Sequence, residues 1–323
     1  MGGSVAQMVE KNTLALVFPG QGSQSIGMMA GFADRAVVKN TFVEASDILK
    51  LDLWKMVTEG PDEALAMTVN TQPVMLAAGV ATFRAWKEAG GADAAVYAGH
   101  SLGEYTALVA AGALTFAAAL PLVRFRAEAM QAAVPEGMGG IAAILGLDEA
   151  TIHEVCRAAM QGEVHGQVCQ AVNLNSPGQI VIAGHRAAVE RGMALAKQKG
   201  AKRAIMLPMS VPSHCALMRP AAERLAQYLE TVALQTPLIA VVQNADVTSF
   251  DSPGAIKQAL VEQLYRPVRW IETIQAIAAR GMKSVFECAP GKVLTGLNKR
   301  IDPSLNCIAL NDATALQNAL HSA

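Results

Sequence analysis

A serine flanked by glycines is the residue of this sequence best placed to do chemistry. Ser101 is the centre of a Gly-x-Ser-x-Gly pattern at 99–103, preceded by the apolar run 94–98 and followed by apolar residues at helical spacing over 104–114. A strand, a tight turn and a helix in this order are typical of a nucleophile elbow, which projects the serine hydroxyl from the end of a sheet. Backbone N–H groups at the helix start, particularly that of Leu102, would then face a developing oxyanion. An idle serine in a glycine-rich turn is the competing interpretation of the pattern alone.

A serine nucleophile needs a base, which is most often a histidine. The sequence holds six histidines. His214 is favoured because it lies in a loop directly after the predicted strand 203–207, and loops at that rim of a sheet form the sites of α/β folds. His100 is adjacent to the serine, but we expect its own turn to point it away from the site. The other four are expected on the surface or in the C-terminal tail, and a loop histidine without a role remains the alternative at 214.

Two arginines lie on the helix predicted after the serine, at 117–133. Arg124 and Arg126 are two positions apart, so their side chains point about 200° apart and one can face inward while the other is solvated. An inward guanidinium near the serine would predict an anionic substrate, because its fork matches a carboxylate. A solvated helix face is the ordinary interpretation of such arginines.

The composition of the chain bears on its domain number and on which binding partners can be excluded. It has 323 residues, of which 52% are hydrophobic and 16% charged, and this predicts a large core in one or two domains. The net charge of −1 gives no field that would draw it to nucleic acid or to a membrane surface. No apolar run is long enough to span a bilayer, and residues 1–12 lack the apolar segment of a secretion signal, so we expect a disordered lead-in there.

Cysteine usage points to a reducing compartment. The five cysteines form no regular framework, which fits a cytoplasmic protein. His153, Cys156, His165 and Cys169 raise the question of a metal, but their spacing is irregular. We therefore expect no metal, and interpret the group as two core cysteines and two exposed histidines.

Strands alternating with helices predict an α/β protein with a mostly parallel sheet covered on both faces. The run 14–18 is typical of a central strand that is buried on both sides. From 138 the order becomes β-α-β-β-α-β, which is typical of a ferredoxin-like unit. We expect a large catalytic domain formed by 13–137 and 208–323, with a ferredoxin-like subdomain inserted at 138–207. Elsewhere in the large domain we expect helices at 34–60, 71–90, 117–133, 217–232, 254–264, 268–280 and 313–321, and strands at 239–243 and 284–288.

Four blocks in the same order resemble the malonyl-CoA:acyl carrier protein transacylase family of type II fatty acid synthesis. They are FPGQGSQ at 18–24, GHSLGEY at 99–105, NSPGQ at 175–179 and VPSH at 211–214, with further matching stretches at 261–268 and 289–297. The resemblance runs from Leu14 to the C-terminus. It implies a hydrolase-like α/β core with a ferredoxin-like insertion. It also implies a monomeric cytoplasmic enzyme that moves a malonyl group from malonyl-CoA to the phosphopantetheine thiol of acyl carrier protein. The enzyme would need no cofactor of its own, because the partner carries the phosphopantetheine.

The resemblance also implies roles for individual residues. Ser101 would be the acylated nucleophile and His214 its base. Gln21 would add an oxyanion-hole N–H beside that of Leu102. Arg126 matches the arginine that binds the substrate carboxylate.

Three further positions match with less distinctive motifs. Gln263 matches a residue whose backbone carbonyl holds the histidine, and Met130 and Asn175 match positions in the substrate pocket. The sequence shows no acid that can be assigned to orient His214. A backbone carbonyl can fix the histidine tautomer without adding charge.

Other functions remain open at this point. A serine hydrolase or thioesterase would pass the acyl group to water, and a non-catalytic module would dock carrier proteins without being acylated. An acyl-loading subunit of a malonate decarboxylase and a polyketide acyltransferase are close variants, and tolerance for methylmalonyl units is undecided. Eight basic residues against three acidic ones over 257–300 could form a docking patch for an acidic carrier, although a mixed solvated surface is the alternative.

Overall fold

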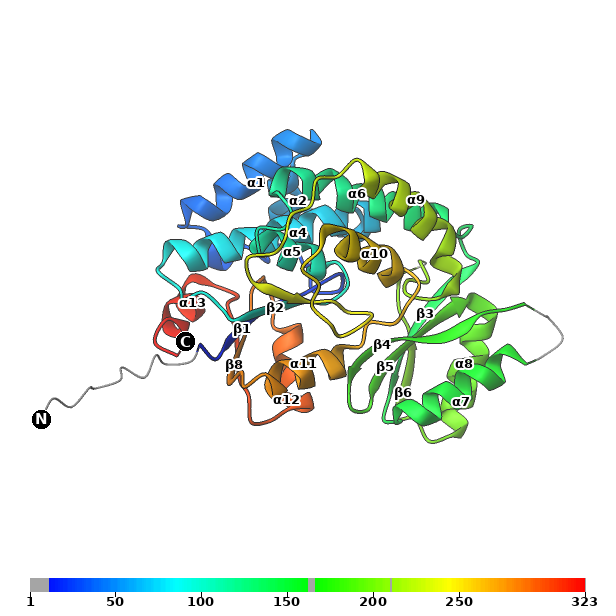
Figure 1. Cartoon of the computed structure of the whole chain (residues 1–323). Helices are drawn as coiled ribbons and strands as arrows, with labels where there is room; N and C mark the ends of the chain where they lie inside the picture. The colour runs from blue at the N-terminus through cyan, green and yellow to red at the C-terminus, as the bar shows by residue number, and fades with distance from the viewer. Residues whose placement is uncertain (1–11, 162–165, 210, 323) are drawn as a thin grey trace, which may run out of the picture.

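Two sheets organise the chain, and Figure 1 shows them side by side. The computed structural model describes residues 12–161, 166–209 and 211–322. The predicted lead-in at 1–12 therefore lies, except for its last residue, outside the described residues. We call the parallel sheet with its helices the large unit and the segment 139–206, around the antiparallel sheet, the small unit.

The large unit is built on a five-stranded sheet in the order β7-β2-β1-β8-β9, in which every neighbouring pair is parallel. Its strands are β1 (Leu14–Phe18), β2 (Val96–Gly99), β7 (Ala240–Val242), β8 (Ser284–Glu287) and β9 (Asn306–Ala309). As predicted, β1 is central and all five of its residues are buried. The edge strand β9 was not predicted, because its short and partly exposed NCIA sequence lacks the apolar run of a central strand.

Alternate residues of β1 enter two different cores, which explains its continuous apolar sequence. Leu14, Leu16 and Phe18 pack against one layer of helices, and Ala15 and Val17 pack against the other. Figure 1 shows most helices on one side of this sheet and α11 with α12 on the other. The helices of the large unit are α1 (Ala36–Leu49), α2 (Leu53–Glu59), α3 (Asp62–Ala66), α4 (Thr68–Glu88), α5 (Gly103–Ala110), α6 (Phe116–Ala132), α9 (Arg219–Glu230), α10 (Pro253–Gln263), α11 (Trp270–Ala279), α12 (Val293–Ile301) and α13 (Ala313–Ala319).

Two helix predictions need correction. The single helix predicted at 34–60 is divided into α1 and α2, because Lys50 adopts a left-handed backbone with φ of 53° and Asp52 caps the second helix through the N–H of Lys55. Helix α4 begins at Thr68 rather than 71, so Pro73 lies inside the helix and not in its first turn. Helix α12 was not predicted. None of the described helices is long and apolar enough to cross a membrane.

The small unit has the predicted β-α-β-β-α-β order. Its elements are β3 (Gly139–Leu145), α7 (Glu149–Met160), β4 (Cys169–Ser176), β5 (Gln179–His185), α8 (Arg186–Gln198) and β6 (Arg203–Met206). All neighbouring strands are antiparallel, in the order β4-β5-β3-β6. Helices α7 and α8 cover one face, and the other face packs residues such as Val172 against Cys215 of the large unit. Backbone bonds between β4 and Val268 join the two units, from the N–H of Leu174 at 3.0 Å and to the carbonyl of Val172 at 2.9 Å.

Candidate active site

The predicted elbow connects β2 to α5, and its glycines are required by close backbone approach. A Cβ on Gly99 would overlap the backbone of Gly103, and a Cβ on Gly103 would overlap the carbonyl of Phe18. Ser101 has a φ of 51°, in the left-handed region that non-glycine residues rarely adopt. Strain of this kind persists only where the surrounding structure fixes it, and it is common at active sites.

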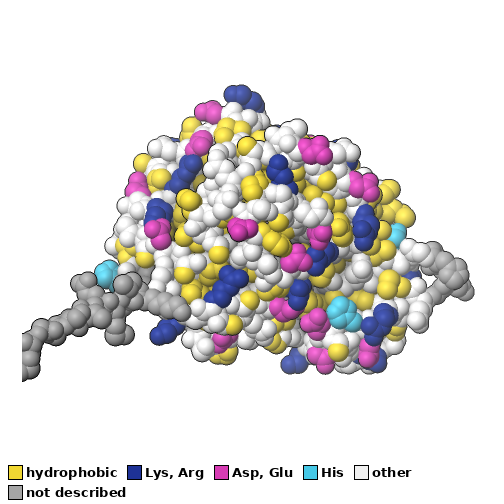
Figure 2. Space-filling model, in the orientation of Figure 1, with side chains coloured by type: hydrophobic (Ala, Val, Ile, Leu, Met, Phe, Trp, Pro, Cys, Tyr) yellow, Lys and Arg dark blue, Asp and Glu magenta, His cyan; other side chains and the backbone are white. Residues whose placement is uncertain are grey.

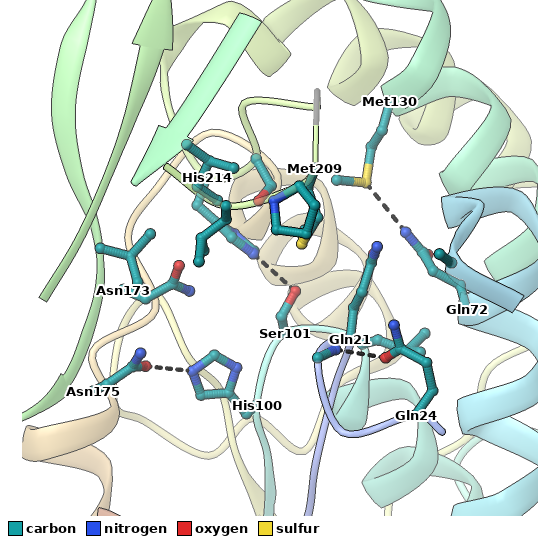
Figure 3. Close-up of a pocket in the computed structure, with 18 of the residues that line it drawn as sticks. Gln21, Gln24, Gln72, His100, Ser101, Met130, Asn173, Asn175, Met209 and His214 are labelled. Carbon is teal, nitrogen blue, oxygen red and sulfur yellow. Dashed lines mark hydrogen bonds between the residues drawn. The ribbon is translucent and has the colours of Figure 1, made fainter. Parts of the chain in front are cut away.

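The structure places His214 against Ser101, as predicted. The Oγ of Ser101 lies 2.8 Å from Nε2 of His214 (Figure 3), and Nδ1 of the same ring lies 2.7 Å from the backbone carbonyl of Gln263. Because a carbonyl can only accept, the proton sits on Nδ1, and Nε2 is free to take the serine proton. The group that orients His214 is therefore a neutral backbone carbonyl, and it belongs to Gln263, as the resemblance implied.

Burial keeps His214 neutral. Its side chain is buried, and desolvation together with the charge of Arg126 lowers its pKa to about 3, while the bond to the Gln263 carbonyl acts in the opposite direction. The ring is therefore in its basic form across the physiological pH range.

Arg126 faces inward and Arg124 faces solvent. Arg126 is 1% exposed, and its Nη2 lies 3.2 Å from Oγ of Ser101 and 2.9 Å from Oε1 of Gln263. Its Nη1 donates to Oε1 of Gln72 at 2.9 Å. Burial lowers the pKa of Arg126, but a guanidinium starts so high that it stays charged. Arg124 pairs with Glu128 on the exposed face of the same helix at 3.2 Å.

Gln21 and Leu102 line the same cavity as Ser101, in the loop after β1 and at the start of α5. Within the described residues, neither backbone N–H donates to an acceptor. The side-chain Nε2 of Gln21 donates to the hydroxyl of Thr68 at 3.3 Å. Two free N–H groups beside the nucleophile are what an oxyanion hole requires.

The cavity has a volume of about 450 Å³ and lies between the two units. Met130 and Asn175, the expected pocket residues, both line it, from α6 and from β4. Met130 accepts a hydrogen bond from Nε2 of Gln72 at 3.6 Å (Figure 3). His100 was expected to point away, which is wrong: it lines the cavity, and its Nε2 lies 2.8 Å from Oδ1 of Asn175.

Several buried polar side chains around the elbow escaped sequence reasoning. Gln72 sits on α4 without a motif, and only its contact with Arg126 reveals it. Glu104 and Asn244 are fully buried beside the turn, and the backbone N–H of Asn244 donates to Oε2 of Glu104 at 2.7 Å. Glu104 directly follows the Gly-x-Ser-x-Gly pattern. An acidic residue at this place in the sequence could have indicated a polar group close to the site.

Comparison with known proteins identifies the family. The model of the acyl transferase domain matches residues 15–302. A malonyl CoA-acyl carrier protein transacylase of Salmonella typhimurium is 52% identical over 307 residues, covering 95% of this chain and 98% of the relative. An acyl-carrier-protein S-malonyltransferase from Burkholderia pseudomallei has a TM-score of 0.93 at 54% identity, covering 96% of this chain and 99% of that one. The chain belongs to the acyl transferase family.

A further solved structure bears on how acyl transferases meet their partners. It is described as a type II polyketide acyl-carrier protein in complex with its malonyl-transacylase, and matches with a TM-score of 0.94 at 50% identity, covering 97% of this chain and all of that one. Of the residues considered for a metal in this acyl transferase, Cys156 and Cys169 pack in the core of the small unit with their sulfurs 3.9 Å apart. His153 is exposed beside Glu149, and His165 lies outside the described residues.

Proposed function

We propose that this acyl transferase moves a malonyl group from malonyl-CoA to the phosphopantetheine thiol of acyl carrier protein, and so supplies fatty acid elongation. One observation carries the substrate class: a buried, charged guanidinium, that of Arg126, lies 3.2 Å from the nucleophile oxygen. A buried charge is costly unless it is paired, and a planar fork matches a carboxylate in two bonds. An acyl group that ends in a carboxylate provides that partner.

The first half-reaction forms a malonyl-serine. His214 takes the proton of Ser101 on Nε2 while Oγ attacks the thioester carbon. The oxyanion is stabilised by the N–H groups of Gln21 and Leu102. The C–S bond then breaks, and the CoA sulfur leaves with the proton from His214.

The second half-reaction reverses these steps. The carrier thiol gives its proton to Nε2, its sulfur attacks the ester carbon, and the Oγ of Ser101 recovers the proton as the ester breaks. A thioester becomes an ester and then a thioester again, so the transfer needs no energy input and no resident cofactor. Met130 and Asn175 would bound the acyl group in this scheme.

The two-unit organisation belongs to the same proposal. We assign residues 13–137 and 208–323 to a catalytic domain with a hydrolase-like core, and 138–207 to a ferredoxin-like subdomain. The strand order β4-β5-β3-β6 and the two helices on one face support the second assignment. We further propose that the protein acts as a cytoplasmic monomer.

The proposed carrier docking rests on charge. Two of the eight basic residues over 257–300 are already paired: Arg266 with Asp246 and Glu262, and Arg269 with Glu272. On the face seen in Figure 2, basic and acidic side chains are interspersed. A docking patch would therefore have to use the remaining residues, such as Lys292 and Lys299.

Intact-mass spectrometry tests the function. After mixing with malonyl-CoA, the wild-type protein should gain one malonyl group, and added carrier protein should remove it. Ser101→Ala should gain none. Stable malonylation of that variant would show that the nucleophile is another residue. Free malonate appearing in place of malonyl-carrier would identify a hydrolase, and carriers of fatty acid and polyketide synthesis compared as acceptors would identify the pathway.

A further inference from the structure

One side-chain amide joins both sides of the turn that carries Ser101. Oδ1 of Asn244 accepts from the backbone N–H of Ser101 at 2.6 Å, and Nδ2 of the same amide donates to the carbonyl of Gly99 at 2.5 Å. Gly99 is the last residue of β2, and Ser101 lies in the turn between β2 and α5. Buried backbone groups outside regular structure need side-chain partners, and Asn244 supplies two.

Strand pairing explains why residue 244 is at this place. Strand β7 runs parallel to β2, with Val242 opposite Ala98. Asn244 is two residues beyond Val242, and the turn at 100–101 is two to three residues beyond Ala98. The two segments therefore leave the same edge of the sheet as neighbours. Asn244 itself is held by Glu104, which accepts its backbone N–H at 2.7 Å.

Asn244 lies behind the turn and not in the cavity wall. It is fully buried, and the side chains that line the cavity include Ser101, Arg126 and His214. A substrate in the cavity therefore contacts the serine side chain, while the Asn244 amide bonds to backbone groups of Gly99 and Ser101. Its effect on catalysis must act through the position of Ser101.

We propose that Asn244 is a positioning residue for the nucleophile: its amide holds the Ser101 backbone in the left-handed conformation that puts Oγ 2.8 Å from Nε2 of His214. This inference rests on the proposed function, in which Ser101 is acylated. A misplacement of a reacting group by about 1 Å can cost about 100-fold in rate. Loss of the amide should therefore slow acylation while leaving substrate binding nearly unchanged.

Two substitutions separate positioning from mere support of the fold. Asn244→Ala removes both bonds. Asn244→Asp introduces a carboxyl group that reproduces both bonds only when protonated, because the ionised form can accept from Ser101 but repels the carbonyl of Gly99. The charged groups around it are Glu104 on α5, Asp246 in its own loop, and Arg266 and Arg269 beyond that loop.

The matched control is Asn298→Ala. Asn298 is also fully buried, and its Oδ1 accepts a bond from the indole of Trp270 at 2.9 Å. This variant loses a buried asparagine whose side chain bonds to Trp270 and not to the backbone of the elbow. It should lower the melting temperature as Asn244→Ala does, but it should keep the acylation rate.

The experiment measures single-turnover acylation by malonyl-CoA, together with labelling of Ser101 by a small fluorophosphonate that needs no acyl pocket. We expect Asn244→Ala to slow both reactions by about 100-fold with KM changed by less than about threefold. For Asn244→Asp, the rate relative to wild type should rise as pH is lowered from about 8 to about 5.

An acylation rate within about threefold of wild type in a folded Asn244→Ala protein would overturn the assignment. If that variant does not fold, the Asn244→Asp variant provides the test. An acylation rate of Asn244→Asp, relative to wild type, that does not change with pH would reject positioning by the amide. A wild-type protein that reacts with the fluorophosphonate but not with malonyl-CoA would instead refute the proposed function.

Discussion

Replacing Arg126 by alanine should change which acyl group the enzyme prefers. Arg126 is 1% exposed and its guanidinium lies 3.2 Å from Oγ of Ser101, so a malonyl carboxylate bound to it would form a desolvated ion pair. Breaking such a pair by removing one partner costs about 3–5 kcal/mol. Since each factor of ten corresponds to about 1.36 kcal/mol, kcat/KM for malonyl-CoA should fall by about 10² to 10⁴.

Acetyl-CoA provides the internal reference for this variant. It has no carboxylate, so its kcat/KM should fall only through indirect effects, chiefly the loss of the bond from Arg126 to Gln263. The measured quantity is therefore the ratio of kcat/KM for malonyl-CoA to that for acetyl-CoA, which removes effects common to both substrates. We expect the ratio to fall at least about 100-fold.

Arg124→Ala is the matched control. It also removes an arginine side chain from α6, but Arg124 is partly exposed and paired with Glu128. Exposed pairs of this kind are worth about 1 kcal/mol or less, so activity and specificity should stay close to wild type. An unchanged malonyl-to-acetyl ratio in Arg126→Ala, or an equal loss in both variants, would refute the carboxylate site.

Three further outcomes are expected. Removing the charge of Arg126 should raise the pKa of His214 above about 3, so that the acid limb of kcat/KM for acetyl-CoA moves to higher pH in Arg126→Ala; an identical limb would contradict the electrostatic coupling. Burial raises the pKa of Glu104 to about 8, so the unfolded chain releases this proton from about pH 4.5 while the folded protein retains it, and stability is lost over that window. Glu104→Gln should therefore gain in melting temperature relative to wild type as pH rises from about 5 to about 8, and a constant difference would count against a buried neutral acid. The KM for carrier protein should rise with salt if basic residues dock an acidic partner, and a salt-independent KM would speak against the patch.

The sequence predicted what local chemistry determines. The apolar run of β1 and the glycines around Ser101 act over a few residues, and the structure has them as expected. Edge strand β9 was missed because its partly exposed NCIA sequence lacks an apolar run. Helix α12 was missed because it has only nine residues and contains Gly296, which weakens the helix signal. The inward direction of His100 was missed because it depends on Asn175, which lies 75 positions away in the small unit.

The buried polar side chains around the site could not be predicted from the sequence for the same reason, because each contacts residues that are distant in the chain. Gln72, Asn244 and the side chain of Gln263 make bonds over separations of 54 to 162 positions. A glutamine or asparagine in isolation is typical of a solvated surface, and only the fold brings these amides into a buried cluster. The family resemblance supplied the backbone role of Gln263, but the contact of its side chain with Arg126 was visible only in the structure.

The charge of Arg126 explains why a backbone carbonyl, and not an acid, stands behind His214. An ionised carboxylate there would lie close to Arg126, because both Arg126 and His214 contact Oγ of Ser101. It would compete with a substrate carboxylate for the guanidinium. The Gln263 carbonyl fixes the same tautomer without that competition. Glu104, the acid buried nearby, keeps its proton at neutral pH because burial raises its pKa to about 8. In the function proposed above, the positive charge of Arg126 is therefore left for the acyl group, and this would make a site otherwise close to that of a serine hydrolase selective for a diacid.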